Sequence, residues 1–225
     1  MHVGFKGPEI LKRYATFIGL LLVTSSAAAI PFHGVEFPSG ASSFADSVVS
    51  YDPTFGGGAA PAAAFQDTSQ ALGIPNYPEG TDPEYVSLGA GGRIVLRFTD
   101  NSLTGSGSAA LDLWIFEIGP DVEDTFVDIS KDGVTWTSVG KVFGATSGID
   151  IDAFGFGTSD FFSYVRLTDD LAEGDRSGTT VGADIDAVGA ISSAPPVITV
   201  PEPGLLALLA LGLAAFCLQY RTSKR

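Results

Sequence analysis

The sequence predicts an all-β protein built as a single β-sandwich, with a short apolar helix near each end of the chain. Helical periodicity is almost absent between Ile30 and Val200. Short apolar segments are instead separated by Gly, Ser, Thr and Asp, which is the pattern of a sandwich of antiparallel strands. The length of this segment fits one domain, which we place at residues 30–193.

The first segment of the chain has the layout of a secretory signal peptide. Lys6, Lys12 and Arg13 precede an apolar run over 17–23, and small alanines follow at 27–29. A basic stretch, an apolar stretch and small residues in this order are recognised and cut during export. We therefore expect residues 1–29 to be a signal peptide cleaved after Ala29, with an uncleaved membrane anchor as the alternative.

Seven short apolar segments are expected to form strands. The predicted strands are Ser47–Tyr51, Gly92–Thr99, Leu111–Glu117, Thr125–Ser130, Val134–Lys141, Phe161–Thr168 and Ala183–Ile191. Two stretches rich in Gly, Ala and Pro, at 56–64 and 73–83, are expected to be loops over the sandwich.

The clearest local prediction is a hairpin around Asp132-Gly133. Residues 126–130 alternate in polarity, Lys131-Asp132-Gly133 supplies turn residues that tolerate positive φ, and 134–139 return. We expect Trp136 to pack between the sheets as a core anchor, and the alternative is an exposed platform for a ligand.

The hairpin sequence Ser130-Lys-Asp-Gly-Val-Thr-Trp136 resembles the Ser-x-Asp-Gly-x-x-Trp hairpin of discoidin-type domains. That resemblance implies a galactose-binding-like jelly roll. The chain departs from these domains because it lacks the cysteines that staple many of them and has no recognisable sugar- or lipid-binding spikes. The resemblance thus supports a fold more than a ligand. Further similar segments are Val86–Phe98, Leu111–Glu117, Tyr164–Asp169 and Ala183–Val188.

The body is strongly acidic. Of the 26 acidic residues only Glu9 and Glu202 lie outside 30–200, whereas half of the 12 basic residues do, so the body carries a formal charge of about −18. Nucleic acid is not expected as a partner, since phosphate binding needs a basic face. The acidity fits either a solvated surface or binding of divalent cations. The chain's only cysteine, Cys217, lies outside the body, so no disulfide is expected there.

Two similar segments suggest calcium sites. Asp150 and Asp152 are two residues apart, as are Asp184 and Asp186. In a strand, each pair projects from one face, where the like charges repel unless they are solvated, protonated or bridged by a cation. We take calcium as the expected cofactor at one of these pairs, with loop hydrogen bonds or Arg partners as the alternative. A further candidate calcium site is the pair Asp112 and Glu117, which flank an apolar strand.

No catalytic site is predicted, and the protein is not expected to be an enzyme. His33 is the body's only histidine, so a Ser-His-Asp triad would depend on it, and the His and Cys spacing of a zinc site is absent. A glycoside hydrolase that uses paired carboxylates is the less favoured alternative.

The last residues form an ordered set of a short motif, an apolar run and a basic end. The motif is Val200-Pro201-Glu202-Pro203, the apolar run spans 204–218, and Arg221, Lys224 and Arg225 follow. The set resembles the PEP-CTERM sorting signal of Gram-negative bacteria, which is also catalogued as an ice-binding-protein C-terminal domain. That resemblance implies recognition by an exosortase-type enzyme. A plain anchor is the alternative, although the run is shorter than the ~20 residues of a usual spanning helix.

Together these features predict an exported, non-enzymatic surface or extracellular-matrix protein. We divide it into a signal peptide (1–29), a sandwich (30–193), a linker (194–203) and a hydrophobic helix with a basic end (204–225). The helix is expected to hold the protein transiently in the inner membrane. Association with exopolysaccharide is the favoured function, and a structural protein without a small ligand is the alternative. Tyr77, Tyr85 and Trp114 are the candidate aromatic ligand residues.

Overall fold

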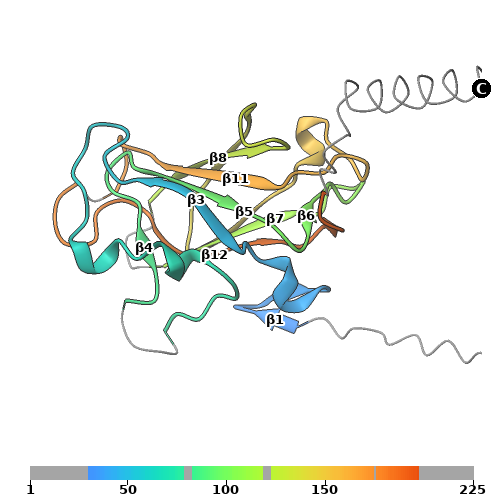
Figure 1. Cartoon of the computed structure of the whole chain (residues 1–225), viewed down its shortest axis with the longest axis horizontal. Helices are drawn as coiled ribbons and strands as arrows, with labels where there is room; N and C mark the ends of the chain where they lie inside the picture. The colour runs from blue at the N-terminus through green and yellow to red at the C-terminus, as the bar shows by residue number, and fades with distance from the viewer. Residues whose placement is uncertain (1–29, 79–82, 119–122, 175, 198–225) are drawn as a thin grey trace, which may run out of the picture.

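The computed structural model describes residues 30–78, 83–118, 123–174 and 176–197. The signal peptide, the sorting motif and the apolar run predicted from the sequence lie outside the described residues. Within them the chain forms two antiparallel sheets packed face to face, as Figure 1 shows. The fold-class prediction of an all-β sandwich is confirmed.

The five-stranded sheet has the order β3-β5-β11-β8-β9, and the four-stranded sheet has the order β10-β7-β12-β4. Successive strands alternate between the two sheets over much of the chain, as in a jelly roll. Two short pairs, β1-β2 and β6-β13, complete the described strands. The bounds are β1 Ile30–Phe32, β2 Val35–Phe37, β3 Ser47–Asp52, β4 Val86–Ser87, β5 Arg93–Arg97, β6 Ser102–Leu103, β7 Leu113–Glu117, β8 Thr125–Ser130, β9 Thr137–Val142, β10 Thr146–Ile149, β11 Tyr164–Asp169, β12 Asp184–Ala190 and β13 Ser193–Ala194.

Short 3₁₀ turns connect some of these strands: η1 Gly40–Ser43, η2 Ala63–Phe65, η3 Thr68–Ala71 and η4 Asp152–Phe154. The stretch predicted as a loop at 56–64 contains only the start of η2, and η3 lies between the two predicted loops. Neither stretch contains a strand among its described residues. Strand β13 includes Ala194, the first residue of the predicted linker.

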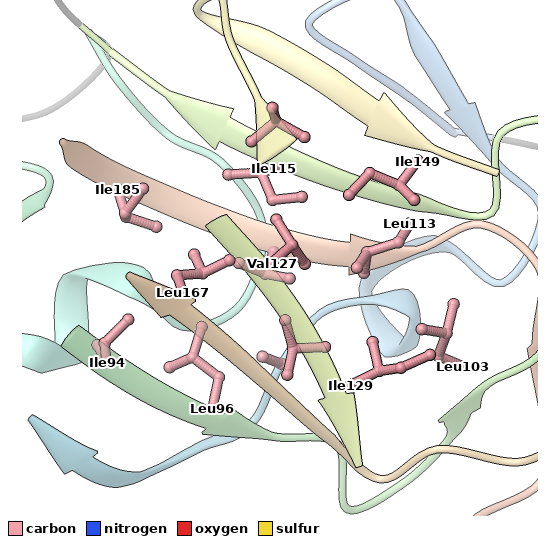
Figure 2. Packing of buried hydrophobic residues seen from close by; sticks show 14 of the residues in the cluster. Ile94, Leu96, Leu103, Leu113, Ile115, Val127, Ile129, Ile149, Leu167 and Ile185 are labelled. Atoms are coloured by element: carbon pink, nitrogen blue, oxygen red, sulfur yellow. The ribbon is translucent and has the colours of Figure 1, made fainter. Parts of the chain in front are cut away.

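The core lies between the two sheets. Figure 2 shows Ile94, Leu96 and Leu167 of the five-stranded sheet facing Ile115 and Ile185 of the four-stranded sheet, and all five side chains are fully buried. On β11 the apolar residues alternate with polar ones, because successive side chains of a strand point to opposite faces. Burial of each such side chain stabilises the fold by about 1.5–3 kcal/mol.

A second, smaller apolar cluster covers the other face of the four-stranded sheet. Phe37 and Phe44 pack against Phe116 and Ala187, with the Phe37 and Phe44 ring centroids 4.7 Å apart. The β1-β2 hairpin lies on this side of the sandwich (Figure 1). The outer face of the five-stranded sheet is different, since it carries polar and charged side chains.

The predicted hairpin forms, but with a longer turn than Lys131–Gly133. Strand β9 begins only at Thr137, and the carboxylate of Asp132 accepts hydrogen bonds from the amides of Val134 (2.8 Å) and Thr135 (2.7 Å). These bonds hold residues 131–136 as a compact loop and lower the pKa of Asp132 to about 2, because they favour its charged form. Gly133 adopts a φ of 75°, as its place in the turn predicted.

Candidate functional site

A groove of about 410 Å³ lies on the outer face of the five-stranded sheet. Its floor comes from β3, β5 and β11, and one wall comes from the hairpin loop that Asp132 organises. Two aromatic side chains, Phe55 and Trp136, and two arginines, Arg93 and Arg166, dominate the lining. The remaining lining residues are Val49, Ser50, Asp52, Val95 and Gly133.

The outer face of the five-stranded sheet carries most of the basic residues of a very acidic body. Only six basic residues lie between residues 30 and 200. Arg93 and Arg97 on β5, Arg166 on β11 and Lys141 on β9 all lie at positions that point away from the core, since Ile94, Leu96, Val165 and Leu167 fill the inward positions. Four of the six basic residues thus share one face.

The two groove arginines keep most of their donors unused. The Nε atom of Arg166 donates to Asp128 Oδ2 at 3.0 Å, and the Nε atom of Arg93 donates to Thr168 Oγ1 at 2.9 Å. Among the described residues, no carboxylate lies within 4.0 Å of the Arg93 guanidinium. Burial, and then the nearby positive charge of Arg166, lower the pKa of Arg93. The terminal nitrogens of both side chains are therefore available to an acceptor.

Each arginine also lies over an aromatic ring. The Arg166 guanidinium carbon is 4.4 Å from the Trp136 ring centroid, and that of Arg93 is 3.5 Å from the Phe55 centroid. Cation–π contacts of this kind hold an arginine in place without using its hydrogen-bond donors. Phe55 is 51% exposed, so part of its ring remains open to solvent.

The prediction that Trp136 packs between the sheets is wrong. Trp136 is half-buried on the outer face, beneath Arg166, because strand β9 begins after it and the loop carries it over the neighbouring strand. Its alternative role as an exposed platform agrees with this position. The sequence reasoning missed Phe55, Arg93 and Arg166 as site residues, although the alternation of arginine with apolar residues on β5 and β11 was a usable signal.

The three aromatic residues predicted to meet a ligand do not lie together. Tyr85 is buried and stacks on Phe65 at 5.6 Å, and Tyr77 meets Tyr85 edge-on at 5.9 Å. Trp114 lies on β7 and packs against the phenylalanine cluster beside Phe116. None of the three lines the groove, and their role in ligand binding stays a prediction.

One group of acidic side chains lies at the end of the β7-β10 pair. Carboxylate oxygens of Asp112, Asp150 and Asp152 all lie within 4.8 Å of one another. Asp112 precedes β7 and Asp150 follows β10, and the pairing of Leu113 with Ile149 brings them together. The strand geometry expected for Asp150 and Asp152 is wrong, because β10 ends at Ile149 and Asp152 starts the turn η4.

A second acidic group contains Asp124, Asp170 and Glu173. Here a cation is already present, because the Nζ atom of Lys141 lies 2.6 Å from Asp124 Oδ2 and 2.7 Å from Asp170 Oδ2. These hydrogen bonds raise the pKa of Lys141 and, together with an amide bond from Ala172, lower that of Asp170.

Asp184 and Asp186, the other pair predicted to bind calcium, have protein partners. Asp186 is 1% exposed and accepts the amides of Asn76 at 3.1 Å and Tyr77 at 3.3 Å. Burial raises the pKa of Asp186 to about 6, although these hydrogen bonds act to lower it. Asp184 accepts a hydrogen bond from the Ser87 hydroxyl. The amide contacts of Asp186 are the alternative expected from the sequence, and calcium at this pair stays a prediction.

Glu117 at the end of β7 is a buried carboxyl of a different kind. It is 4% exposed, and neither carboxyl oxygen has a hydrogen-bond partner among the described residues. Burial, and then the negative charges of Glu123 and Asp184, raise its pKa to about 9. Glu117 is not among the residues that line the groove. His33 is exposed in the β1-β2 turn, edge-on to Phe116 at 5.9 Å.

Comparison with protein families concerns the segment beyond the sandwich. Residues 199–221 match the model of the PEP-CTERM protein-sorting motif, and they include the predicted Val200, Pro201, Glu202, Pro203 and Arg221. The chain carries a PEP-CTERM protein-sorting motif. This motif implies export, anchoring in a membrane before processing, and processing by an exosortase. Among the residues that the structure describes, no helix is both long and apolar enough to cross a membrane.

The chain has partial likeness to solved structures. The protein CpGH89CBM32-6 produced by Clostridium perfringens shares 12% identity at a TM-score of 0.33, over 51% of this chain and 81% of its own. The C-terminal domain of a chitobiase from Bacteroides fragilis shares 14% identity at a TM-score of 0.34, over 71% and 98%. No curated protein sequence matches the chain.

Proposed function

We propose that the protein is sorted to the bacterial surface or extracellular matrix and there binds an acidic glycan in the groove of the five-stranded sheet. The observation that carries this proposal is the pair Arg93 and Arg166. In a body of about −18 formal charge, both side chains offer free terminal nitrogens next to two aromatic rings.

A sugar that bears a carboxylate matches these groups. A guanidinium binds a carboxylate through two parallel, charge-assisted hydrogen bonds, which are stronger than bonds between neutral groups. The apolar face of a sugar ring is suited to the exposed part of Phe55 or Trp136, and Asp52 can accept from sugar hydroxyls. The acidic remainder of the body repels a polyanion, so binding is confined to this groove.

The groove is tested with polygalacturonate as an acidic polysaccharide and dextran as a neutral one. We expect the full chain, purified in mild detergent, to bind polygalacturonate and not dextran. Arg93→Gln and Arg166→Gln should each weaken binding about 10-fold or more, since a hydrogen bond to a charged group contributes about 1.5–3 kcal/mol. Arg97→Gln is the matched control, because Arg97 lies on the same face but outside the groove lining.

Binding should be visible in the groove tryptophan itself. The chain has two tryptophans, so Trp114→Phe leaves Trp136 as the single reporter. We expect its fluorescence to change on adding polygalacturonate and to stay constant with dextran. Equal binding of both polysaccharides, or unchanged affinity in both groove variants, would contradict the proposal. No binding to any member of a glycan array would favour a structural protein without a small ligand.

Sorting is tested on the exported protein. The PEP-CTERM motif implies that an exosortase-type enzyme processes the chain near Pro201-Glu202-Pro203, after the apolar run has held it in the inner membrane. Mass spectrometry of the exported form should then show that Arg225 has been removed. An intact Arg225 on the secreted protein would overturn the processing step, and it would leave the proposal for the groove unaffected.

A further inference from the structure

We propose that Asp112, Asp150 and Asp152 form a calcium site that fastens the loop before β7 to the turn after β10. The three carboxylates come from two segments that are about 40 residues apart in the chain, and the pairing of β7 with β10 holds them together. This site is independent of the glycan groove, which lies on the other sheet.

The first reason is the burial of Asp112. Its side chain is fully buried, and only one of its two oxygens has a partner: Oδ2 accepts the amide of Ile151 at 2.9 Å. The Oδ1 atom has no hydrogen-bond partner among the described residues. A buried carboxylate with an unused oxygen costs several kcal/mol unless a charge or donor compensates it.

The second reason is the absence of a protein cation. Among the described residues, no lysine, arginine or histidine nitrogen lies within 4.0 Å of Asp112, Asp150 or Asp152. The other acidic group differs in this respect, because Lys141 bridges Asp124 and Asp170. Three carboxylates that share a space of less than 5 Å without a protein cation repel one another, so the arrangement calls for an ion from solution.

The ligand set fits calcium. The oxygens of this group lie within 4.8 Å of one another, which is close enough for all three carboxylates to bind one ion. Calcium binds carboxylate and neutral oxygens in flexible geometry, whereas magnesium demands near-ideal octahedral geometry. Calcium also accepts irregular sets of ligands, which suits a site made of two loops.

Neighbouring groups fix the positions of the Asp150 and Asp152 carboxylates. The amide of Gly107 donates to both Asp152 oxygens, at 3.2 and 3.1 Å. The Ser106 hydroxyl lies 3.3 Å from Asp152 Oδ2 and adds a neutral oxygen. Asp150 Oδ1 accepts the Asp152 amide at 2.9 Å, which fixes the turn. Asp150 and Asp152 are only half-buried, so an ion and its remaining waters can enter from solvent.

The test compares the melting temperature, Tm, of the full chain in mild detergent with calcium, with magnesium and with chelator. For the Kd of about 10⁻⁴ M typical of extracellular modules, about 5 mM calcium shifts the folding equilibrium about 50-fold and raises the Tm by about 5–9 °C. Magnesium should give a smaller rise. Calorimetric titration should show one calcium per chain.

Two variants locate the ion. Asp150→Asn keeps an oxygen that can accept the Asp152 amide, so it should fold normally and lose most of the calcium-dependent rise. Asp112→Asn should raise the Tm in chelator, because it removes an uncompensated buried charge, and lower the Tm in calcium, because it removes a ligand. A variant that is simply less stable lowers the Tm under both conditions.

Asp184→Asn is the matched control, since the sequence also predicted calcium at Asp184, and it should keep the wild-type calcium response. The proposal is overturned if calcium changes neither the Tm nor the heat of titration of the wild-type chain. It is also overturned if Asp150→Asn responds like the wild type, or if Asp184→Asn alone removes the response.

Discussion

Replacing Glu117 with Gln should make the protein more stable at neutral pH and flatten the dependence of its stability on pH. Glu117 is buried, its carboxyl oxygens have no hydrogen-bond partner among the described residues, and Glu123 and Asp184 lie near it. These surroundings favour the protonated acid. An amide of the same shape stays neutral at every pH, so Gln imitates the protonated form.

The magnitude follows from the two pKa values. Glu117 has a pKa of about 9 in the folded protein against the ordinary 4.5, so folding requires the acid to keep its proton. Its stabilising contribution is complete below pH 4.5 and is lost as the pH rises towards 9. Each pH unit in this range costs about 1.4 kcal/mol, which amounts to about 3 kcal/mol of lost stability by pH 7. Gln should recover about 2–3 kcal/mol of this, or about 4–12 °C in Tm.

The assay is thermal unfolding of the wild type and Glu117→Gln from pH 4.5 to pH 8, in chelator so that no bound ion contributes. The two proteins should melt at nearly the same temperature at pH 4.5 and diverge as the pH rises. Glu36→Gln is the control, because Glu36 is exposed on β2, and it should show no such divergence. A Tm difference that is the same at pH 4.5 and pH 8, or a variant that is less stable than the wild type at pH 8, would refute this account of Glu117.

Two further changes test the scaffold. Asp186→Ala removes the acceptor for the amides of Asn76 and Tyr77, so chemical denaturation should show a loss of about 2–4 kcal/mol, whereas Asp186→Asn, which keeps an acceptor oxygen, should lose much less. Ile115→Ala leaves a cavity between the sheets and should cost about 2–5 kcal/mol in the same measurement. The control Val134→Ala, at an 81% exposed position, should cost under about 0.5 kcal/mol. Equal losses of stability at the two sites would argue against a core at Ile115.

Five of the seven predicted strands form within two residues of their predicted bounds. Thr125–Ser130 has the predicted bounds, and the strands predicted at Gly92–Thr99 and Ala183–Ile191 form with ends shortened by one or two residues. Strands such as β1 and β10 were not predicted, because three or four residues are too few to display a period. They form where a longer neighbour supplies hydrogen bonds, as β7 does for β10.

The sequence did not predict which side chains from distant segments meet, as Asp112, Trp136 and Arg166 show. The alternation on β11 is a local signal that could have placed Arg166 on the polar face of the strand. The loop that carries Trp136 over the same face depends instead on the side-chain hydrogen bonds of Asp132. Similarly, the sequence marked Asp150 and Asp152 as a pair, and Asp112 only as the flank of a strand. Their meeting depends on strand register, because a change of one residue in the pairing of β7 with β10 would separate them.

The sequence by itself thus determined the properties that are local or additive along the chain: the β-sandwich class, the acidity of the body and the PEP-CTERM motif. Periodicity, charge and a contiguous motif are complete within the residues that carry them. Only the tertiary structure decided which carboxylates share a space, which of them meet a lysine, and which arginines lie beside Trp136. Those relations depend on register and on loop paths between segments far apart in the chain, and no local pattern specifies them.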